Sequence, residues 1–167
     1  PLAEGQRTLR YGPAALLRRG AGGQGGRSAS QQSKALVDVV IPLYNKVEYT
    51  KACLESLEAT KGEVTFRLIL VDNGSTDGTS ELLEAWADRA VVLRPGENLG
   101  FSKGNNLGAR HGDSPYILFL NNDTVAEEGW LDRLFEAIDS SPEVGIVGPK
   151  LLYPNRTIQH AGLEIIG

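Results

Sequence analysis

The stretch Tyr116-Ile117-Leu118-Phe119-Leu120-Asn121-Asn122-Asp123-Thr124 ends a run of apolar residues on three side chains that carry oxygen atoms. The apolar part has the length and composition of a buried strand. In an open α/β sheet, ligands bind beyond the carboxyl ends of the strands. A carboxylate at that edge, here Asp123, can hold a divalent cation against a phosphate. Asn and Asp also favour ordinary turns, and on this stretch alone a turn without a ligand is the simpler interpretation.

The composition is that of one globular domain. The chain has 167 residues, of which 41% are hydrophobic and 23% are charged. The net charge of -4 gives no reason to expect nucleic acid as a partner. The one cysteine, Cys53, excludes an internal disulfide and a cysteine-rich zinc site, and we expect it to be a small buried residue.

Apolar segments long enough to reach across a membrane are not seen in the sequence. No run approaches the roughly 20 residues that a helix needs to span a bilayer. The first residues have no apolar core like that of a signal peptide. We therefore expect a cytoplasmic protein.

Residues 1–34 differ from the rest of the chain. They contain the Gly-rich stretch Gly20–Gly26, which cannot bury enough apolar surface to offset its ordering entropy. Leu9–Arg19 has the pattern of a short basic helix. We expect residues 1–34 to form a disordered or linker tail without a function, and residues 35–167 to form the folded domain.

From residue 36 onward, apolar runs of strand length alternate with helical patterns. This alternation predicts an α/β fold with a mostly parallel sheet and helices on both faces. The expected strands are 36–42, 66–71, 90–93, 116–120 and a buried 144–148, and the expected helices are 47–60, one around 82–86, 101–110 and 128–140. Residues 150–153 and 163–166 are further strand material, joined through a polar turn at 154–156.

Three of these strands end in polar residues, at Tyr44-Asn45, Asp72-Asn73 and Asn121-Asn122-Asp123. Because the carboxyl ends of parallel strands share one edge of the sheet, these loops are expected to form one site. Glycines at positions 100, 104 and 108 recur every four residues and fall on one face of a helix. That face allows backbone or ligand to approach closely, and tight helix packing is the alternative.

Four stretches, taken together, resemble the family 2 glycosyltransferases, and most of all their rhamnosyltransferase-like branch. They are Val39–Asn45, Val71–Thr79, Asn98–Gly108 and Leu120–Thr124, within a resemblance that covers about 36–167. The resemblance implies a GT-A fold, a nucleotide-diphosphate sugar as donor, a divalent cation (Mg or Mn) and inversion at the anomeric carbon.

The resemblance also implies roles for single residues. Asp72 takes the place of the acid that accepts a hydrogen bond from a pyrimidine N–H, a role that suits an ionised carboxylate. Lys103 lies in the segment beside the donor phosphates. Asp123 takes the place of the metal-binding carboxylate. The implied substrate-binding residues come from four loops: Pro42, Tyr44, Asn45, Asp72, Asn73, Asn98, Gly100, Lys103, Asn106, Asn121 and Asn122.

The sequence departs from the family pattern at the D-x-D motif, because Asn121 and Asn122 leave Asp123 as its only carboxylate. Water and diphosphate oxygens are then expected to complete the metal shell, as is common for magnesium. The base that deprotonates the acceptor hydroxyl is an Asp or Glu in this family. Glu127-Glu128 is better explained as favourable charge at a helix start, and Glu164 lies in an expected strand. We therefore expect the base beyond residue 167, in a protein of which this chain is the donor-binding, C-terminally truncated part.

Two histidines have ordinary explanations as well. His160 falls where the family's chain re-enters the sheet region, and a structural or exposed histidine is the preferred interpretation. His111 follows a helix, whose carboxyl end a positive charge complements.

Two other function classes compete with a glycosyltransferase. A sugar-phosphate nucleotidyltransferase carries a Gly-rich loop after its first strand, and Pro42–Lys46 has no glycine. A non-catalytic nucleotide-sugar-binding or interaction module would keep the fold and lack the base.

The resemblance further implies a glycan or lipid-linked acceptor in cell-surface polysaccharide synthesis. Segments outside this chain could place the protein at the inner face of the membrane. The closest branch favours rhamnose on a thymidine diphosphate as the donor.

Overall fold

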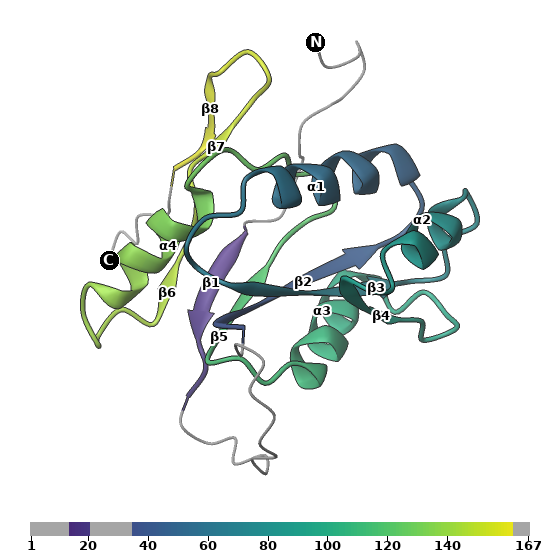
Figure 1. Ribbon diagram of the computed structural model, residues 1–167, viewed down its shortest axis with the longest axis horizontal. Helices are drawn as coiled ribbons and strands as arrows, with labels where there is room; N and C mark the ends of the chain where they lie inside the picture. The colour runs from purple at the N-terminus through teal and green to yellow at the C-terminus, as the bar shows by residue number, and fades with distance from the viewer. Residues whose placement is uncertain (1–13, 21–34, 162–167) are drawn as a thin grey trace, which may run out of the picture.

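The computed structural model describes residues 14–20 and 35–161. Within them, six strands form one sheet in the order β4-β3-β2-β5-β1-β6, and β7 and β8 form a separate hairpin (Figure 1). The strands are β1 (Ala15–Arg18), β2 (Val37–Leu43), β3 (Phe66–Asp72), β4 (Ala90–Leu93), β5 (Tyr116–Phe119), β6 (Ile146–Val147), β7 (Leu151–Leu152) and β8 (Ile158–His160). The helices are α1 (Val47–Ala59), α2 (Thr79–Ala85), α3 (Gly100–His111) and α4 (Trp130–Asp139).

Strand β2 is the centre of the parallel part of the sheet. It pairs in parallel with β3 on one side and with β5 on the other, so that Val39 lies opposite both Leu68 and Leu118. All seven residues of β2 are buried, as expected for a β-branched run covered on both faces. Strand β4 extends the parallel part beyond β3. The expected α/β fold and its first four strands are confirmed.

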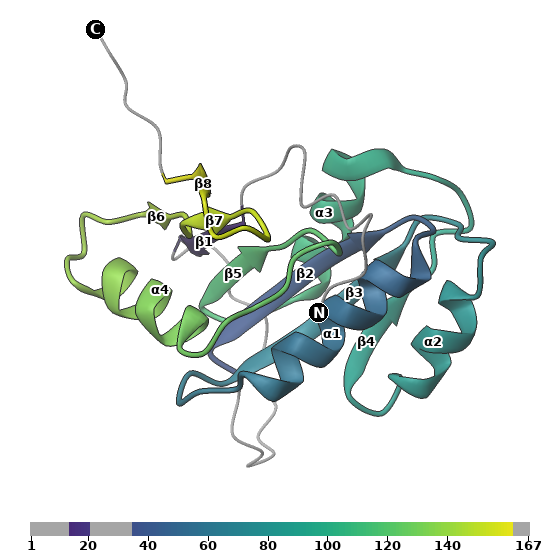
Figure 2. The ribbon, with the colours of Figure 1, turned by 90° about the horizontal axis from the view of Figure 1, so that it is seen from above.

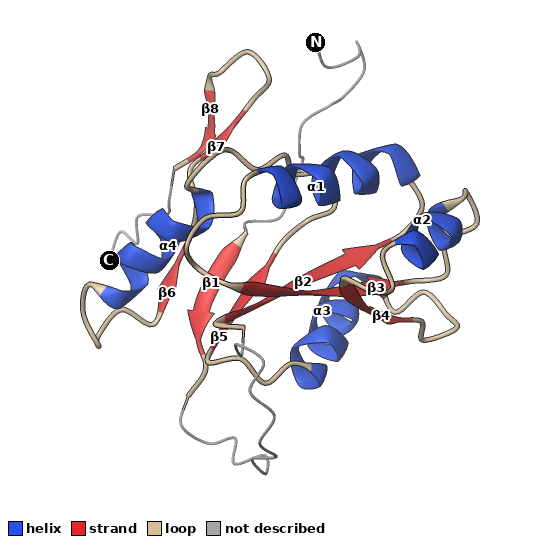
Figure 3. Cartoon of the chain, viewed as in Figure 1, coloured by secondary structure: helices blue, strands red, loops and turns tan. Residues whose placement is uncertain are grey.

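Helices cover both faces of the sheet (Figure 2). Helices α1, α2 and α4 pack on one face, where the larger core includes Leu54, Leu83 and Leu134. Helix α3 lies on the other face, over a smaller core that includes Val40 and Ile69. The alternation of helix and strand that produces this layering is visible in Figure 3. None of the described helices is long and apolar enough to cross a membrane.

The expected basic helix within residues 9–19 is wrong for the part that the structure describes. Residues Ala15–Arg18 form β1, an antiparallel strand inserted between β5 and β6. Leu16 is fully buried in the larger core. As a strand, this segment hydrogen-bonds the backbone N–H and C=O groups along one side of β5, which a helix could not do. Such long-range contacts outweigh a weak local helical pattern. Residues 14–20 therefore belong to the folded domain, while 1–13 and 21–34 lie outside the described residues.

The C-terminal strands also differ from expectation. Residues 144–148 were expected to form a buried strand, but β6 covers only Ile146–Val147 and leaves the Ile146 side chain 60% exposed, because this strand lies at the edge of the sheet. Strand β7 pairs with β8 at Ile158–His160, a strand that we did not expect. The expected strand at 163–166 lies outside the described residues.

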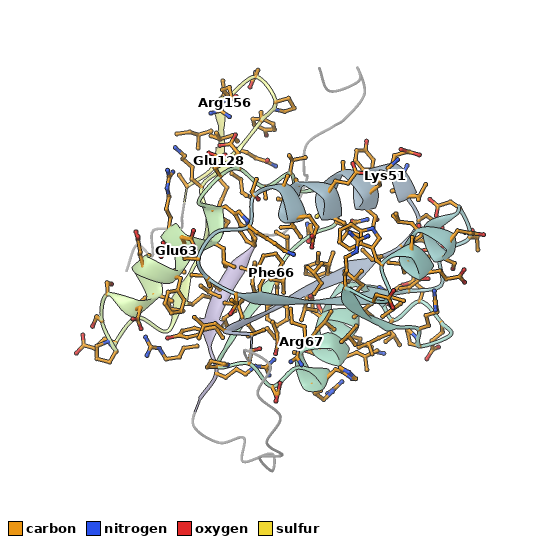
Figure 4. All side chains as sticks on the ribbon, in the orientation of Figure 1. Lys51, Glu63, Phe66, Arg67, Glu128 and Arg156 are labelled. Carbon is orange, nitrogen blue, oxygen red and sulfur yellow. The ribbon has the colours of Figure 1, made fainter. Side chains whose placement is uncertain are left out.

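A buried carboxylate joins the amino ends of the central strands. Asp38 of β2 is fully buried on the α3 side of the sheet. Its oxygens accept hydrogen bonds from Arg67 of β3 at 2.6 and 2.9 Å and from the backbone and hydroxyl of Ser114 at 2.9 and 2.8 Å. Arg19, just after β1, adds an ion pair at 3.3 Å. Figure 4 shows Arg67 on this side of the sheet. A fully paired buried carboxylate of this kind is a structural group.

Leu16→Ala tests whether β1 is part of the fold. Replacing a fully buried leucine should lower the free energy of unfolding by about 2–5 kcal/mol, through lost burial and the cavity left behind. Urea unfolding measures this change. Ile146→Ala, at the exposed position on neighbouring β6, is the matched control and should change stability by less than about 0.5 kcal/mol. Equal effects of the two substitutions would contradict the assignment of Leu16 to the core.

Asp38→Ala tests the buried charge network. Because it leaves Arg67 and Ser114 without their main acceptor, we expect a loss of about 3–5 kcal/mol in the free energy of unfolding. Asp113→Ala removes the other carboxylate that pairs with Arg67, at 2.8 Å, but this side chain is 66% exposed. Its removal should cost less than about 1 kcal/mol. An Asp38→Ala protein as stable as the Asp113→Ala protein would refute the network's structural role.

Candidate functional site

The three polar loops meet at the carboxyl edge of the sheet, as expected. The backbone N–H of Asn73, after β3, donates to the carbonyl of Leu43 at the end of β2, at 2.9 Å. The N–H of Leu120, after β5, donates to the carbonyl of Val40 at 3.0 Å. The loops that follow β2, β3 and β5 therefore leave the sheet side by side.

The loops after β2 and β3 hold each other through side-chain hydrogen bonds. The N–H of Asn45 donates to the hydroxyl of Ser75 at 2.8 Å, and the side-chain oxygen of Asn45 accepts from the N–H of Thr76 at 2.7 Å. Asn45 and Lys46 have left-handed backbones, with φ of 55° and 64°. Residues other than glycine rarely adopt this conformation unless neighbouring contacts impose it. The sequence motif thus produces a loop of defined shape.

Asp77 holds the loop after β2 in place where that loop leads into α1. Its carboxylate accepts a hydrogen bond from the N–H of Val47, the first residue of α1, at 2.9 Å. It also accepts from the hydroxyl of Thr79 at 2.6 Å. The hydrogen bond from Thr79 lowers the pKa of Asp77, and the bond from Val47 adds to this effect. Asp77 thereby joins the amino ends of α1 and α2.

Asp72 and Asn73 lie at the centre of the site. Both are almost fully buried, and Asp72 accepts a hydrogen bond from the N–H of Ser75 at 2.9 Å. The side-chain oxygen of Asn73 has no hydrogen-bond partner within the described residues. Tyr44, in the neighbouring loop after β2, is by contrast 53% exposed. An exposed ring can stack on a planar ligand, and a buried acceptor can receive a hydrogen bond from it.

Helix α3 approaches this centre through two of its glycines. A Cβ atom on Gly108 would come within 2.4 Å of Val40 Cγ1, so this glycine allows the helix to pack against the sheet. A Cβ atom on Gly104 would lie 3.2 Å from the side-chain nitrogen of Asn73. Gly100 has φ of +70° and no neighbour at its Cβ position, so it serves the turn into the helix. The expected close approach is present, for helix packing at Gly108 and beside the site at Gly104.

Other residues expected on this segment are exposed. Lys103 and Asn106 face outward from α3, and Asn98 accepts a hydrogen bond from the N–H of Gly100 at 2.8 Å. The sequence reasoning missed Asn105, which is buried and whose side-chain oxygen is also without a partner among the described residues. Its spacing of three residues from Gly108, on the same face of the helix, was the available signal.

Asp123 is partly buried, and one of its carboxylate oxygens is completely covered but has no hydrogen-bond partner among the described residues. Burial raises its pKa above the ordinary value. A buried acceptor without a donor requires an explanation, and a bound cation would supply one. In the described part of the chain, no three His, Cys, Asp or Glu side chains converge. The residues present therefore fit a cation held by one carboxylate, with water and ligand oxygens completing its shell.

The residues beside Asp123 contact α1. The side-chain amide of Asn122 donates to the hydroxyl of Thr50 at 2.9 Å, and the thiol of Cys53 lies 3.8 Å from the carbonyl oxygen of Asn121. Burial raises the pKa of Cys53 to about 12, and the charge of Asp123 adds to the shift. Cys53 is the small buried residue that we expected.

The two glutamates after Asp123 are not at a helix start. Helix α4 begins at Trp130 rather than at residue 128. Glu127 forms an ion pair with Arg156 in the turn between β7 and β8, and Figure 4 shows Arg156 and Glu128 at this end of the molecule. The helix-charge explanation is therefore wrong for Glu127, because its negative charge pairs with the guanidinium group of Arg156 instead.

Three further acid and base candidates are placed as follows. His160 is partly buried in β8, opposite Leu151. His111 is the exposed last residue of α3. Glu164 lies outside the described residues.

Comparison with known proteins identifies relatives of this fold and site. The family model described as glycosyl transferase family 2 matches residues 38–159. The chain is 37% identical over 132 residues to the O-antigen biosynthesis protein RfbC of Myxococcus xanthus, which covers 77% of this chain. It is 31% identical over 125 residues to the glycosyltransferase AglE of Haloferax volcanii, which covers 71% of this chain. The chain spans only 10% of the first relative and 41% of the second.

Solved structures share the fold. Staphylococcus aureus TarS 1-349 in complex with UDP superimposes with a TM-score of 0.56 and 25% identity, over 62% of this chain and 32% of that one. The mannosyltransferase PcManGT of Pyrobaculum calidifontis, solved in complex with GDP-Man and Mn²⁺, gives a TM-score of 0.57 at 21% identity, over 65% of this chain and 33% of that one. The sheet and helices described above therefore form a GT-A fold.

Asp77→Ala tests how the loop after β2 is held. It removes the acceptor of the Val47 N–H group, so amide hydrogen exchange at Val47 should become faster. The free energy of unfolding should fall by about 1 kcal/mol, as for loss of a helix cap. Because the folded-state pKa is lowered, this stabilisation is complete above about pH 3.9 and is lost as the pH falls through the folded-state pKa. Asp88→Ala, at an exposed aspartate after α2, is the control and should change neither quantity.

Proposed function

Because the chain belongs to glycosyl transferase family 2, we propose that it binds the donor in a glycosyltransferase that moves a hexose from a nucleotide-diphosphate sugar to a glycan or a lipid-linked acceptor. One observation carries this proposal. At the carboxyl edge of the sheet, Asp123 holds a buried carboxylate oxygen without a donor among the described residues, next to loops that present Asp72 and Asn73. Such an arrangement suits a nucleotide whose diphosphate is held through a cation.

The nucleoside end of the donor lies between the loops after β2 and β3. Tyr44 stacks on the base, and Asp72 accepts a hydrogen bond from a pyrimidine N–H. Pro42 and Asn45 line the same pocket, whose shape the bonds from Asn45 to Ser75 and Thr76 maintain. The UDP bound in TarS, which is 25% identical to this chain, supports a pyrimidine nucleotide. Thymidine diphosphate with rhamnose is the variant that we favour from the sequence motifs.

The diphosphate and sugar lie between the loop after β5 and helix α3. Asp123 binds a divalent cation, Mg²⁺ or Mn²⁺, and Asn121 and Asn122 border it. When bound, the cation neutralises the charge that develops on the leaving diphosphate. Lys103 faces solvent on α3 and can reach a phosphate as a mobile positive charge. Asn98, Gly100 and Asn106 belong to the same segment.

The acceptor hydroxyl loses its proton to a carboxylate that we expect beyond residue 167. Its oxygen attacks the anomeric carbon while the bond from that carbon to the diphosphate breaks, which inverts the configuration and releases the nucleoside diphosphate. Glu127 is the first carboxylate after Asp123 in the sequence, and we do not assign it as the base because it is exposed and paired with Arg156. We place the protein in cell-surface polysaccharide synthesis at the inner face of the membrane, in line with its similarity to an O-antigen biosynthesis protein.

Calorimetric titration tests the donor site. The chain is titrated with UDP, TDP, CDP and GDP, with and without Mg²⁺ or Mn²⁺. We expect one pyrimidine diphosphate to bind most tightly, and the cation to strengthen its binding by roughly tenfold or more, which corresponds to about 1.4 kcal/mol. In Asp123→Ala, binding should no longer depend on the cation. Glu128→Ala, which removes an exposed carboxylate from the same loop, is the matched control and should behave as the unaltered chain does.

The outcomes separate the competing functions. Binding that Asp123→Ala makes independent of the cation supports a donor site. Binding of the same nucleotides without any effect of the cation or of Asp123→Ala would contradict the metal assignment and favour a nucleotide-binding module. No binding of any nucleotide would contradict the donor site itself.

A further inference from the structure

Helix α1 carries a row of short polar side chains that faces the loop after β5. Thr50, Cys53 and Ser56 are spaced three residues apart, so they follow one another along the same side of the helix. Thr50 and Cys53 are almost completely buried, and Ser56 is partly buried. Buried hydroxyl groups are retained where they have hydrogen-bond partners, and both Thr50 and Ser56 have a partner in the loop after β5.

Each of the three side chains holds a different point of the loop. Thr50 accepts a hydrogen bond from the side-chain amide of Asn122 at 2.9 Å. The thiol of Cys53 lies 3.8 Å from the carbonyl of Asn121, within range of a weak S–H bond. The hydroxyl of Ser56 accepts from the N–H of Ala126 at 2.9 Å and donates to the carbonyl of Cys53 at 2.7 Å.

These contacts lie on both sides of Asp123. Asn121 and Asn122 are held before it and Ala126 after it. Asp123 itself has a covered carboxylate oxygen with no partner in the described part of the chain. The attachment of its neighbours to α1 therefore fixes the backbone that carries this carboxylate.

We propose that Thr50 and Ser56 are positioning residues, which hold the Asp123 loop against α1 so that its carboxylate faces the diphosphate of the donor. This inference rests on the proposed donor site. It adds a structural role for Asn122, whose amide nitrogen binds Thr50 while its side-chain oxygen is not part of that hydrogen bond. Neither Thr50 nor Ser56 belongs to the four stretches that carry the family resemblance.

The other end of α1 is attached to the nucleoside side of the site. Asp77 binds the N–H of Val47, the first residue of α1, directly after the left-handed residues Asn45 and Lys46. One rigid helix thus joins the loop beside the base to the loop beside the cation. The distance between the two ends of the donor site is set by α1.

The test uses the whole chain with three substitutions. Thr50→Val keeps the shape of the side chain and removes its hydroxyl, Ser56→Ala removes the acceptor of the Ala126 N–H, and Thr50→Ser restores a hydroxyl. Thr60→Val is the matched control, because the Thr60 hydroxyl bonds only to the carbonyl of Ser56 within the end of the same helix, at 2.7 Å. Thermal unfolding establishes that each variant is folded.

Two readouts are taken. Without ligand, hydrogen exchange at the Ala126 amide should become faster in Ser56→Ala and remain unchanged in Thr60→Val. With whichever of UDP, TDP, CDP and GDP the unaltered chain binds most tightly, the ratio of the Kd without Mn²⁺ to the Kd with Mn²⁺ should fall by about three- to tenfold in Thr50→Val and in Ser56→Ala, as expected for the loss of one hydrogen bond. The Kd for that nucleotide without Mn²⁺ should not change, and Thr50→Ser should recover the original ratio.

The outcomes distinguish this inference from the proposed function. If the unaltered chain binds none of UDP, TDP, CDP and GDP, the donor site fails, and the Ala126 exchange rate alone decides whether α1 holds the loop. If the unaltered chain shows Mn²⁺-dependent binding and both Thr50→Val and Ser56→Ala keep the full ratio, the donor site stands and the positioning role is refuted. Equal losses in Thr60→Val would also refute it, since they would reflect general weakening of the helix.

Discussion

The buried carboxylate of Asp38 is the interaction on which the arrangement of the sheet depends. It accepts hydrogen bonds from Arg67 of β3 and from Ser114, two residues before β5 begins. It also forms an ion pair with Arg19, the residue after β1. A buried charge is tolerated only when its partners are in place, so the strands β3, β2, β5 and β1 must be aligned at this end. Alignment at the amino ends of parallel strands also sets where their carboxyl ends lie.

The opposite end of the same strands has the reverse character. There, buried oxygens of Asn73, Asn105 and Asp123 lack donors from the described residues. Proteins satisfy nearly all of their buried polar groups, and the ligand that we propose would supply donors or a cation to these acceptors. At the amino end of β2, by contrast, both carboxylate oxygens of Asp38 are paired.

Helix α1 connects these features into one site. Its first residue is held by Asp77 beside the left-handed residues Asn45 and Lys46, and its buried side holds the loop of Asp123. Because helices are stiff compared with loops, this attachment transmits the geometry of the sheet to both loops. This is why we propose a positioning role for Thr50 and Ser56, whose hydrogen bonds attach that loop to α1.

The amino-acid sequence by itself determined the parallel strands, the helices between them and most of the candidate site. Apolar runs and helical spacing are local patterns, and the polar motifs follow directly after the strands that place them. The tertiary structure alone decided three other features. Strand β1 forms because residues 15–18 pair with β5 and β6, whose partner residues lie 98 to 131 positions further along the chain. The partners of Asp38 and the attachment of the Asp123 loop to Thr50 and Ser56 likewise join distant segments, and local sequence carries no record of which distant groups will meet.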